Sequence, residues 1–278
     1  MIWLNGERAE RAETAALPVA DRGYLLGDGL FETLLVVDGN PVFPDLHLER
    51  LYQSLPALAM PPRYGRTQIL KALSDLAADM FAATGAQRNV LRLTVTRTGD
   101  RGLAMSSEAD QNWLITGSPA NPPPASMRVK VIDICRPASA PTSRLKSVNY
   151  LDNILARRQA VEAGADEALM VNEHGRLACA GAANIFFMRD NEILTPPIAE
   201  GALPGTRRAR LLSHAQEIHD QTGLQLLEVP VTRQDLAGCN AAFLTNSLMG
   251  AVPITCIDDC AKEKSPAMQA ISDCLKAD

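Results

Sequence analysis

Hydrophobic residues recur along the chain at spacings that predict a mixture of strands and amphipathic helices. In the first half, strands are predicted at 1–4, 30–37, 41–43, 89–96 and 113–116, and helices at about 46–59 and 67–84. In the second half, strands are predicted at 127–135, 167–172, 183–188, 225–229 and 241–245, and helices at 151–163, 205–222 and about 265–276. No internal repeat is evident. The pattern predicts an α+β protein.

The proline-rich segment 118–126 separates the two halves. It contains four prolines in nine residues, which is incompatible with a helix or a central strand. We therefore predict a small N-terminal domain at 1–117, a semi-rigid linker at 118–126 and a larger C-terminal domain at 127–278. A length of 278 residues is consistent with two domains.

Composition and charge narrow the functional classes. Hydrophobic residues make up 46% of the chain, which is enough for a substantial core, but no apolar run reaches the roughly 18 residues of a membrane span. A net charge of −5 argues against nucleic acid as a partner. The N-terminus does not resemble a signal peptide. The expectation is a cytoplasmic protein that does not bind membranes.

The six cysteines contain no CxxC pair, so we interpret them as reduced thiols. Cys256 and Cys260 are close enough in sequence to share a metal ion, but no histidine lies near them. A structural role is favoured, and no metal site is predicted.

Lys146 differs from the other five lysines in its sequence context. It lies in Arg144-Leu-Lys-Ser-Val-Asn-Tyr-Leu-Asp152, just before a predicted helix. A partly desolvated lysine loses preference for its charged form, and its amine can then attack a carbonyl. An ordinary surface lysine is the alternative on spacing alone.

Two glycine-bearing turns, each interpreted as the start of a helix, suggest phosphate binding. Gly201-Ala-Leu-Pro-Gly205-Thr206-Arg207 leads into a predicted helix, and Thr245-Asn-Ser247-Leu-Met-Gly250 follows a strand. Backbone N–H groups at a helix start, together with a hydroxyl, can hold a phosphate. A simple helix cap is the alternative. Neither turn matches a dinucleotide-binding or P-loop motif.

Three further side chains could face a site. Arg50 and His47 share one face of a predicted amphipathic helix, where an arginine is solvated or binds an anion and a histidine is functional or structural. Arg101 lies on a glycine-flanked loop, where it could bind a substrate carboxylate or simply be exposed.

Taken in order, these motifs resemble the class IV aminotransferases, which are pyridoxal-phosphate enzymes of fold type IV. The group includes branched-chain and D-amino acid aminotransferases and 4-amino-4-deoxychorismate lyases. The matching segments are Asp21-Arg-Gly-Tyr-Leu-Leu-Gly-Asp-Gly-Leu-Phe-Glu-Thr33, His47-Leu-Glu-Arg-Leu51, Leu145-Lys-Ser-Val-Asn-Tyr-Leu-Asp152, Asp166-Glu-Ala-Leu169, Ala182-Ala-Asn-Ile-Phe186, Leu203-Pro-Gly-Thr-Arg207 and Thr245-Asn-Ser-Leu-Met-Gly250.

The resemblance implies a role for each matched residue. Lys146 corresponds to the lysine that binds the cofactor as a Schiff base and then carries a proton to and from the substrate. The remaining cofactor-binding positions are Arg50, Tyr150, Cys179, Leu203, Thr206, Arg207 and Ser247. Within this set, Tyr150 would bond the phenolic oxygen of the cofactor, and the backbone amides of Thr206 and Arg207 would bind its phosphate. Phe31 and Arg101 correspond to positions on the substrate side. The family is usually homodimeric.

Two positions depart from the family pattern. Five residues before Asn184 the family usually has a glutamate that keeps the pyridine nitrogen protonated, and here that residue is Cys179. A neutral thiol does not stabilise a pyridinium as a carboxylate does. Either another acid compensates, with Glu173 a nearby candidate, or the reaction needs less stabilisation. The D-amino acid branch also has a histidine two residues after its loop arginine, where this chain has Leu103.

Three functions are compatible with this pattern. The leading hypothesis is transfer of an amino group between an amino acid and a 2-oxo acid. The second is lyase chemistry that releases pyruvate from 4-amino-4-deoxychorismate to give 4-aminobenzoate, favoured by Gly27-Asp-Gly-Leu-Phe-Glu and Asn246-Ser-Leu-Met-Gly but not by Tyr150. The third is a family member that binds the cofactor with weak turnover because of Cys179.

Overall fold

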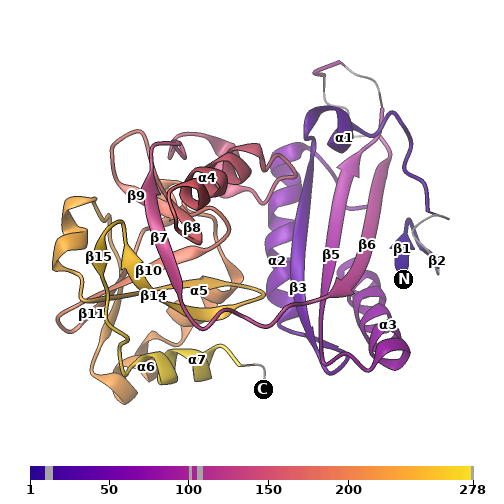
Figure 1. Ribbon diagram of the computed structural model, residues 1–278. Coiled ribbons are helices and arrows are strands. Elements are labelled where there is room, and N and C mark those ends of the chain that lie inside the picture. The colour runs from indigo at the N-terminus through magenta and orange to yellow at the C-terminus, as the bar shows by residue number, and fades with distance from the viewer. Residues whose placement is uncertain (10–14, 100–101, 105–108, 277–278) are drawn as a thin grey trace. The chain divides into compact units, whose positions relative to one another are not determined.

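Two β-sheets organise the computed structural model, which describes residues 1–9, 15–99, 102–104 and 109–276. Each sheet belongs to a separate compact unit (Figure 1). Unit 1 contains Met1–Pro122 and Leu145–Asn149, and unit 2 contains Pro123–Arg144 and Tyr150–Asp278. The division falls within the segment 118–126. The short stretch that carries Lys146 groups with unit 1, although the limits 127–278 would place it in the C-terminal domain.

Unit 1 is built on a six-stranded antiparallel sheet with the order β2-β1-β6-β5-β3-β4. The strands are β1 (Ile2–Leu4), β2 (Glu7–Ala9), β3 (Gly29–Val37), β4 (Asn40–Pro41), β5 (Arg88–Arg97) and β6 (Gln111–Pro119). Its α-helices are α1 (Arg22–Leu26), α2 (Pro44–Ser54) and α3 (Arg66–Thr84), and a 3₁₀ turn at Leu55–Leu58 follows α2.

The core of unit 1 lies between the hydrophobic face of its sheet and the hydrophobic faces of its helices, as the strand and helix spacings of apolar residues predict. Alternate residues of β5, such as Leu91 and Leu93, point to the same face and meet the apolar stripes of α2 and α3, where Leu48 and Leu73 are fully buried. Each buried leucine contributes roughly 1.5–3 kcal/mol relative to an exposed one. Both tryptophans of the chain, Trp3 and Trp113, lie in this core.

Unit 2 contains a nine-stranded mixed sheet with the order β12-β11-β10-β13-β14-β7-β8-β9, and β15 pairs with β14. The strands are β7 (Met127–Ile132), β8 (Glu167–Val171), β9 (Leu177–Ala180), β10 (Asn184–Arg189), β11 (Glu192–Thr195), β12 (Gln225–Glu228), β13 (Ala241–Asn246), β14 (Gly250–Ile257) and β15 (Cys260–Ala261). The α-helices are α4 (Leu151–Glu162), α5 (Thr206–Ser213), α6 (Ala215–Thr222) and α7 (Met268–Cys274). The predicted α+β class is confirmed.

Several predicted elements differ from the observed ones. The single helix predicted at 205–222 is wrong, because the chain breaks at His214, which ends α5 and begins α6 with a non-helical backbone. The Nδ1 atom of His214 lies 2.9 Å from the carbonyl oxygen of Arg210 and so competes with the helical hydrogen-bonding pattern. The strand predicted at 127–135 ends at Ile132.

Strands β2, β9, β11, β14 and β15 lie outside the predicted strand ranges. β9 is a four-residue run, Leu-Ala-Cys-Ala, with no β-branched residue. β14 contains Pro253, a residue that argues against a central strand. The structure tolerates this proline because the parallel pairing of β14 with β7 begins only after it, at Ile254.

Candidate active site

The predicted site residues are distributed over both units. Unit 1 carries Phe31, Arg50 and Lys146, whereas unit 2 carries Tyr150, Cys179, Leu203, Thr206, Arg207 and Ser247. Arg101 lies outside the described residues.

Lys146 is held by backbone hydrogen bonds to the start of β3. The N–H of Phe31 donates to the carbonyl oxygen of Lys146 at 2.8 Å, and the N–H of Val148 donates to the carbonyl oxygen of Gly29 at 3.0 Å. Leu30 and Ser147 form the antiparallel bridge between these two contacts. The segment therefore runs alongside β3 like a short additional strand, which fixes the position of the Lys146 side chain.

The amine of Lys146 lies on an aromatic ring. Its Nζ atom is 4.1 Å from the ring centroid of Phe31, which is 4% exposed. The guanidinium carbon of Arg92 is 3.7 Å from the same centroid. Two cations thus share the π system of one buried ring, an arrangement in which ring attraction partly replaces water around the amine.

Glu32 joins the two side chains that the sequence singles out on α2. Its Oε1 accepts from Arg50 Nε at 2.8 Å, and its Oε2 accepts from Arg50 Nη2 at 2.5 Å. Oε2 also lies 2.6 Å from His47 Nδ1. Glu32 lies within a matched segment, yet sequence reasoning did not single it out, because strand–helix pairing is not visible in local spacing.

The charges of this cluster are set by burial and by its internal contacts. Burial alone would raise the pKa of Glu32, but the charges and hydrogen bonds of Arg50 and His47 outweigh it and lower that pKa to about 2. Burial is the main cause that lowers the pKa of His47; Glu32 opposes it, and the positive charges of Arg50 and Lys146 add to it. At neutral pH the cluster therefore combines a carboxylate, a neutral imidazole and a guanidinium.

The first of the two turns predicted to bind phosphate, at 201–207, leads into a helix as expected. Gly205 caps α5, which begins at Thr206. The first N–H groups of a helix have no acceptor within the helix, and the helix dipole favours an anion there. The side-chain Nδ2 of Asn184 donates to the carbonyl oxygen of Leu203 at 2.8 Å, which connects β10 to this turn.

Gly205 is required for that close approach. A Cβ atom at this position would overlap Oδ1 of Asn184. We expect Gly205→Ala to displace Asn184 and the start of α5, and to weaken binding of inorganic phosphate or a phosphorylated cofactor at least about tenfold, which corresponds to roughly 1.4 kcal/mol. Titration calorimetry measures this. Gly238→Ala is the control, since its Cβ would meet only an ordinary contact at 3.6 Å.

The second turn is a hairpin and not a helix start, so that part of the prediction is wrong. Residues 246–250 connect β13 to β14, and Oδ1 of Asn246 accepts from the N–H groups of Leu248 and Met249 at 3.0 and 2.8 Å. The side chain of Arg207 donates to the carbonyl oxygen of Ser247 at 3.4 Å. The fold thereby brings the predicted residues Arg207 and Ser247 together with the start of α5.

A buried hydroxyl lies beside this turn. Thr245 is 1% exposed, and its Oγ1 has no hydrogen-bond partner among the described residues. An unsatisfied buried hydroxyl costs roughly 1–3 kcal/mol. The donors at the start of α5 and this orphaned hydroxyl fit a bound phosphate-bearing group such as pyridoxal phosphate.

The side of unit 2 predicted to face the pyridine nitrogen fits that cofactor less well. Cys179 lies on β9 and is 3% exposed. Glu173, the nearby candidate for a compensating acid, is engaged elsewhere: its carboxylate accepts from the N–H groups of Ala138 and Ser139 at 2.6 and 3.0 Å. Those bonds lower its pKa to about 2. Tyr150 is half-buried at the start of α4.

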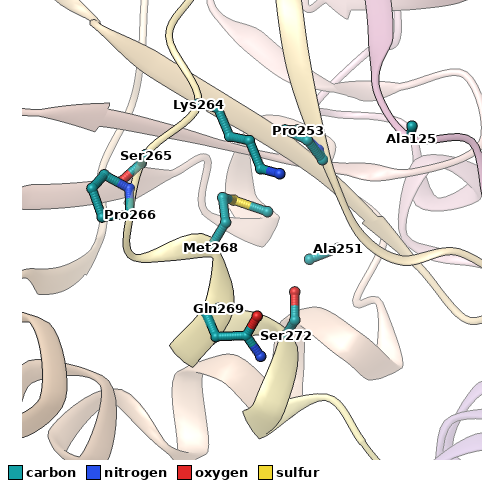
Figure 2. A pocket seen from close by; sticks show the side chains of 9 residues that line it. All are labelled: Ala125, Ala251, Pro253, Lys264, Ser265, Pro266, Met268, Gln269 and Ser272. Carbon is teal, nitrogen blue, oxygen red and sulfur yellow. The ribbon is translucent and has the colours of Figure 1, made fainter.

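A pocket of about 400 Å³ in unit 2 contains none of the predicted site residues. Lys264 and Met268 line this pocket, and Figure 2 shows both side chains projecting into it. Across the described ranges, no cluster of three or more histidine, cysteine, aspartate or glutamate residues is arranged to hold a metal ion. The same ranges include no helix that is both long and apolar enough to cross a membrane.

Comparison with known proteins places these features in a family. The family model for class IV amino-transferases matches residues 29–257. A candidate branched-chain-amino-acid aminotransferase of Methanocaldococcus jannaschii is 29% identical, covering 92% of this chain and 88% of its own length. Aminodeoxychorismate lyase of Bacillus subtilis is also 29% identical, covering 93% and 87%.

A solved structure supports the same assignment. A candidate 4-amino-4-deoxychorismate lyase of Legionella pneumophila superimposes with a TM-score of 0.85 and 30% identity, covering 95% of this chain and 96% of that one. The family model spans most of the sequence, including Lys146 and both turns of unit 2. The chain belongs to the class IV aminotransferase family.

Proposed function

We propose that the protein is a pyridoxal-phosphate-dependent aminotransferase that moves an amino group between an amino acid and a 2-oxo acid. Class IV aminotransferases are pyridoxal-phosphate enzymes. The observation that carries the proposal is the placement of Lys146, whose half-buried amine rests on the ring of Phe31.

The roles of the residues follow from their chemistry. When bound, pyridoxal phosphate supplies an aldehyde that condenses with amines and a ring that withdraws electrons from the substrate. Lys146 would hold that aldehyde and then move the proton at the substrate's α-carbon. The phosphate would be bound by Arg50, Thr206, Arg207 and Ser247. Tyr150 would orient the phenolic oxygen, Leu203 would contact the cofactor, and Phe31 and Arg101 would contact the substrate.

Chemical trapping tests the central assignment. Borohydride reduction of the protein incubated with pyridoxal phosphate should fix the cofactor on Lys146, and peptide mass spectrometry locates the modified lysine. Addition of an amino acid before reduction should release one equivalent of 2-oxo acid and prevent the modification. A cofactor fixed on another lysine, or none fixed at all, would refute the proposal.

A second candidate function is elimination of pyruvate from 4-amino-4-deoxychorismate. Its support is the similarity to the lyase of Bacillus subtilis over 93% of this chain. Release of fluorescent 4-aminobenzoate from this substrate, without 2-oxo acid formation from any amino acid, would favour the lyase over the aminotransferase.

Arg50 is the proposed phosphate-binding residue of unit 1, and its replacement tests that role. Loss of one charge-assisted contact typically costs about 1.5–3 kcal/mol, so Arg50→Ala should raise the dissociation constant of pyridoxal phosphate roughly 10- to 150-fold. Equilibrium dialysis measures this. Arg63→Ala is the control, because Arg63 forms an exposed ion pair with Asp110 in the same unit. Equal affinities of the two variants would exclude Arg50 from cofactor binding.

We also propose that the protein acts as a homodimer in the cytoplasm. The family resemblance supports the dimer. Six cysteines, none of which forms a disulfide among the described residues, support a reducing compartment. Light scattering after size-exclusion chromatography should give twice the chain mass of 29.9 kDa. A monomer at micromolar concentration would contradict the dimer.

A further inference from the structure

Arg207 is a buried arginine in the first turn of α5, where it is 5% exposed. Its backbone N–H belongs to the proposed phosphate site, whereas its guanidinium binds two other parts of unit 2. Nη2 donates to the carbonyl oxygen of Ser247 at 3.4 Å, and Nη1 donates to the carbonyl oxygen of Leu275 at 2.5 Å. The guanidinium thus connects the start of α5 with the turn at 246–250 and with the end of α7.

The carbonyl end of α7 faces α5. The last carbonyl groups of a helix have no N–H partner within the helix and lie at the negative end of its dipole, so they attract guanidinium groups. Arg210 of α5 also donates to this end, from Nε to the carbonyl oxygen of Cys274 at 2.6 Å. α7 is fixed by its own apolar face, on which Ile271 is fully buried. It therefore gives the guanidinium of Arg207 an acceptor in a fixed position.

The other contact of Arg207 reaches the second segment predicted to bind phosphate. Ser247 lies 40 residues after Arg207 in the sequence, in the hairpin turn between β13 and β14. A guanidinium is planar and carries its donors in a rigid fork, so it can hold two acceptors in a defined geometry. The ammonium of a lysine has no such fork. The side chain of Arg207 consequently sets the position of the turn relative to the start of α5.

We propose that the guanidinium of Arg207 is a positioning group, which holds the turn at 246–250 against the start of α5, with α7 as its support, so that both segments bind one phosphate. The inference rests on the proposed function for the identity of the phosphate-bearing ligand. The side chain of Arg207 then acts through Ser247 and not by contact with the phosphate. Loss of the guanidinium weakens the binding of phosphate groups in particular.

Two substitutions separate positioning from charge. Arg207→Met removes the charge and both hydrogen bonds, whereas Arg207→Lys keeps the charge and loses the planar fork. We expect each variant to raise the dissociation constant of inorganic phosphate at least about tenfold, because two hydrogen bonds from a charged donor are lost. Titration calorimetry measures this. A phosphate affinity of Arg207→Lys close to that of the wild type would overturn the inference, because the charge alone would then suffice.

Arg208 supplies the matched control. It is the next residue of α5, is 4% exposed, and donates to the carbonyl oxygen of Pro196 at 3.0 Å and to the carboxylate of Glu228. Arg208→Lys disturbs a buried arginine of the same helix without touching the contact with the turn, so phosphate affinity should not change. An equal loss of phosphate affinity in Arg208→Lys and Arg207→Lys would overturn the inference.

Pyridoxal, which lacks the phosphate, distinguishes a local effect from general damage to unit 2. Arg207→Met should bind pyridoxal as tightly as the wild type does, and should bind pyridoxal phosphate more weakly. Equilibrium dialysis measures both affinities. If the substitution weakens the binding of the two compounds equally, Arg207 has only a general structural role.

Amide hydrogen exchange tests the support from α7. Coupling between two sites is reciprocal, so if α7 strengthens the phosphate site through Arg207, bound phosphate stabilises α7. Inorganic phosphate at saturating concentration should slow exchange at residues 268–274 in the wild type and not in Arg207→Met. Unchanged exchange of α7 in the wild type contradicts the inference even where neither variant folds.

The outcomes separate this inference from the proposed function. Unchanged phosphate affinity in Arg207→Met, with the cofactor fixed on Lys146 after borohydride reduction, overturns the inference alone. Failure to fix the cofactor on Lys146 overturns the proposed function, whereas the titrations with inorganic phosphate decide the role of Arg207 in either case.

Discussion

Replacing Lys146 by alanine is expected to abolish covalent attachment of the cofactor and to reduce turnover by at least about 10³-fold. The size of the effect follows from the two roles proposed for this amine, nucleophile toward the cofactor and proton carrier at the substrate, each of which typically accounts for several orders of magnitude. The measurements are borohydride trapping followed by mass spectrometry, and the rate of 2-oxo acid formation.

Two controls make the result specific. Lys71→Ala removes an exposed lysine of the same unit whose ion-pair partner is Asp75 on its own helix, and it should leave trapping and turnover unchanged. Phosphate affinity of Lys146→Ala should also persist, because the proposed phosphate-binding residues remain. Trapping that survives in Lys146→Ala would assign the chemistry to a different lysine.

Replacing Glu32 by glutamine is expected to destabilise unit 1 by about 3–5 kcal/mol, the usual cost of removing one member of a buried ion pair. Glu32 is 1% exposed and holds both Arg50 and His47. Glutamine keeps the shape but not the charge, which leaves Arg50 without its counter-ion. Urea unfolding followed by tryptophan fluorescence measures the effect, since both tryptophans lie in the core of unit 1.

The loss of unfolding free energy caused by Glu32→Gln should depend on pH in a definite direction. The pKa of Glu32 is lowered from 4.5 to about 2 by folding, so its contribution to stability is complete above about pH 4.5 and disappears as the pH falls towards about 2. The difference in unfolding free energy between wild type and Glu32→Gln should therefore decrease as the pH falls from about 4.5 towards about 2. Glu49→Gln is the matched control, because Glu49 is exposed on α2 and accepts a hydrogen bond from Gln53 on the same helix. If the difference in unfolding free energy between the two proteins stays constant with pH, the ionised carboxylate of Glu32 is not its cause.

The longer helices of both units are easier to predict than the turns. The helices α2, α3 and α4 lie close to their predicted positions, because each has a regular hydrophobic repeat or a clear stop signal. In sequence, the turn at 246–250 looks like a helix start, because glycine and serine residues are common in both contexts. Only its pairing between β13 and β14 identifies it as a hairpin.

The candidate site contains residues that the family resemblance indicates and residues that only contacts in the folded chain reveal. Resemblance was sufficient to nominate Lys146, Arg50 and the two turns of unit 2. Neither local spacing nor resemblance indicated Glu32 as the partner of Arg50. That pairing depends on a contact between residues that are far apart in the sequence.

The amino-acid sequence by itself determined the α+β class and most of the helices, because hydrophobic periodicity is a local property, and through the family resemblance it nominated Lys146 as the reactive lysine. Only the tertiary structure decided that Lys146 lies along β3 on the ring of Phe31, and that Glu32 pairs with Arg50 and His47. These contacts arise from strand pairing and from the packing of distant segments, whose energies depend on the whole unit and not on any single stretch of the chain.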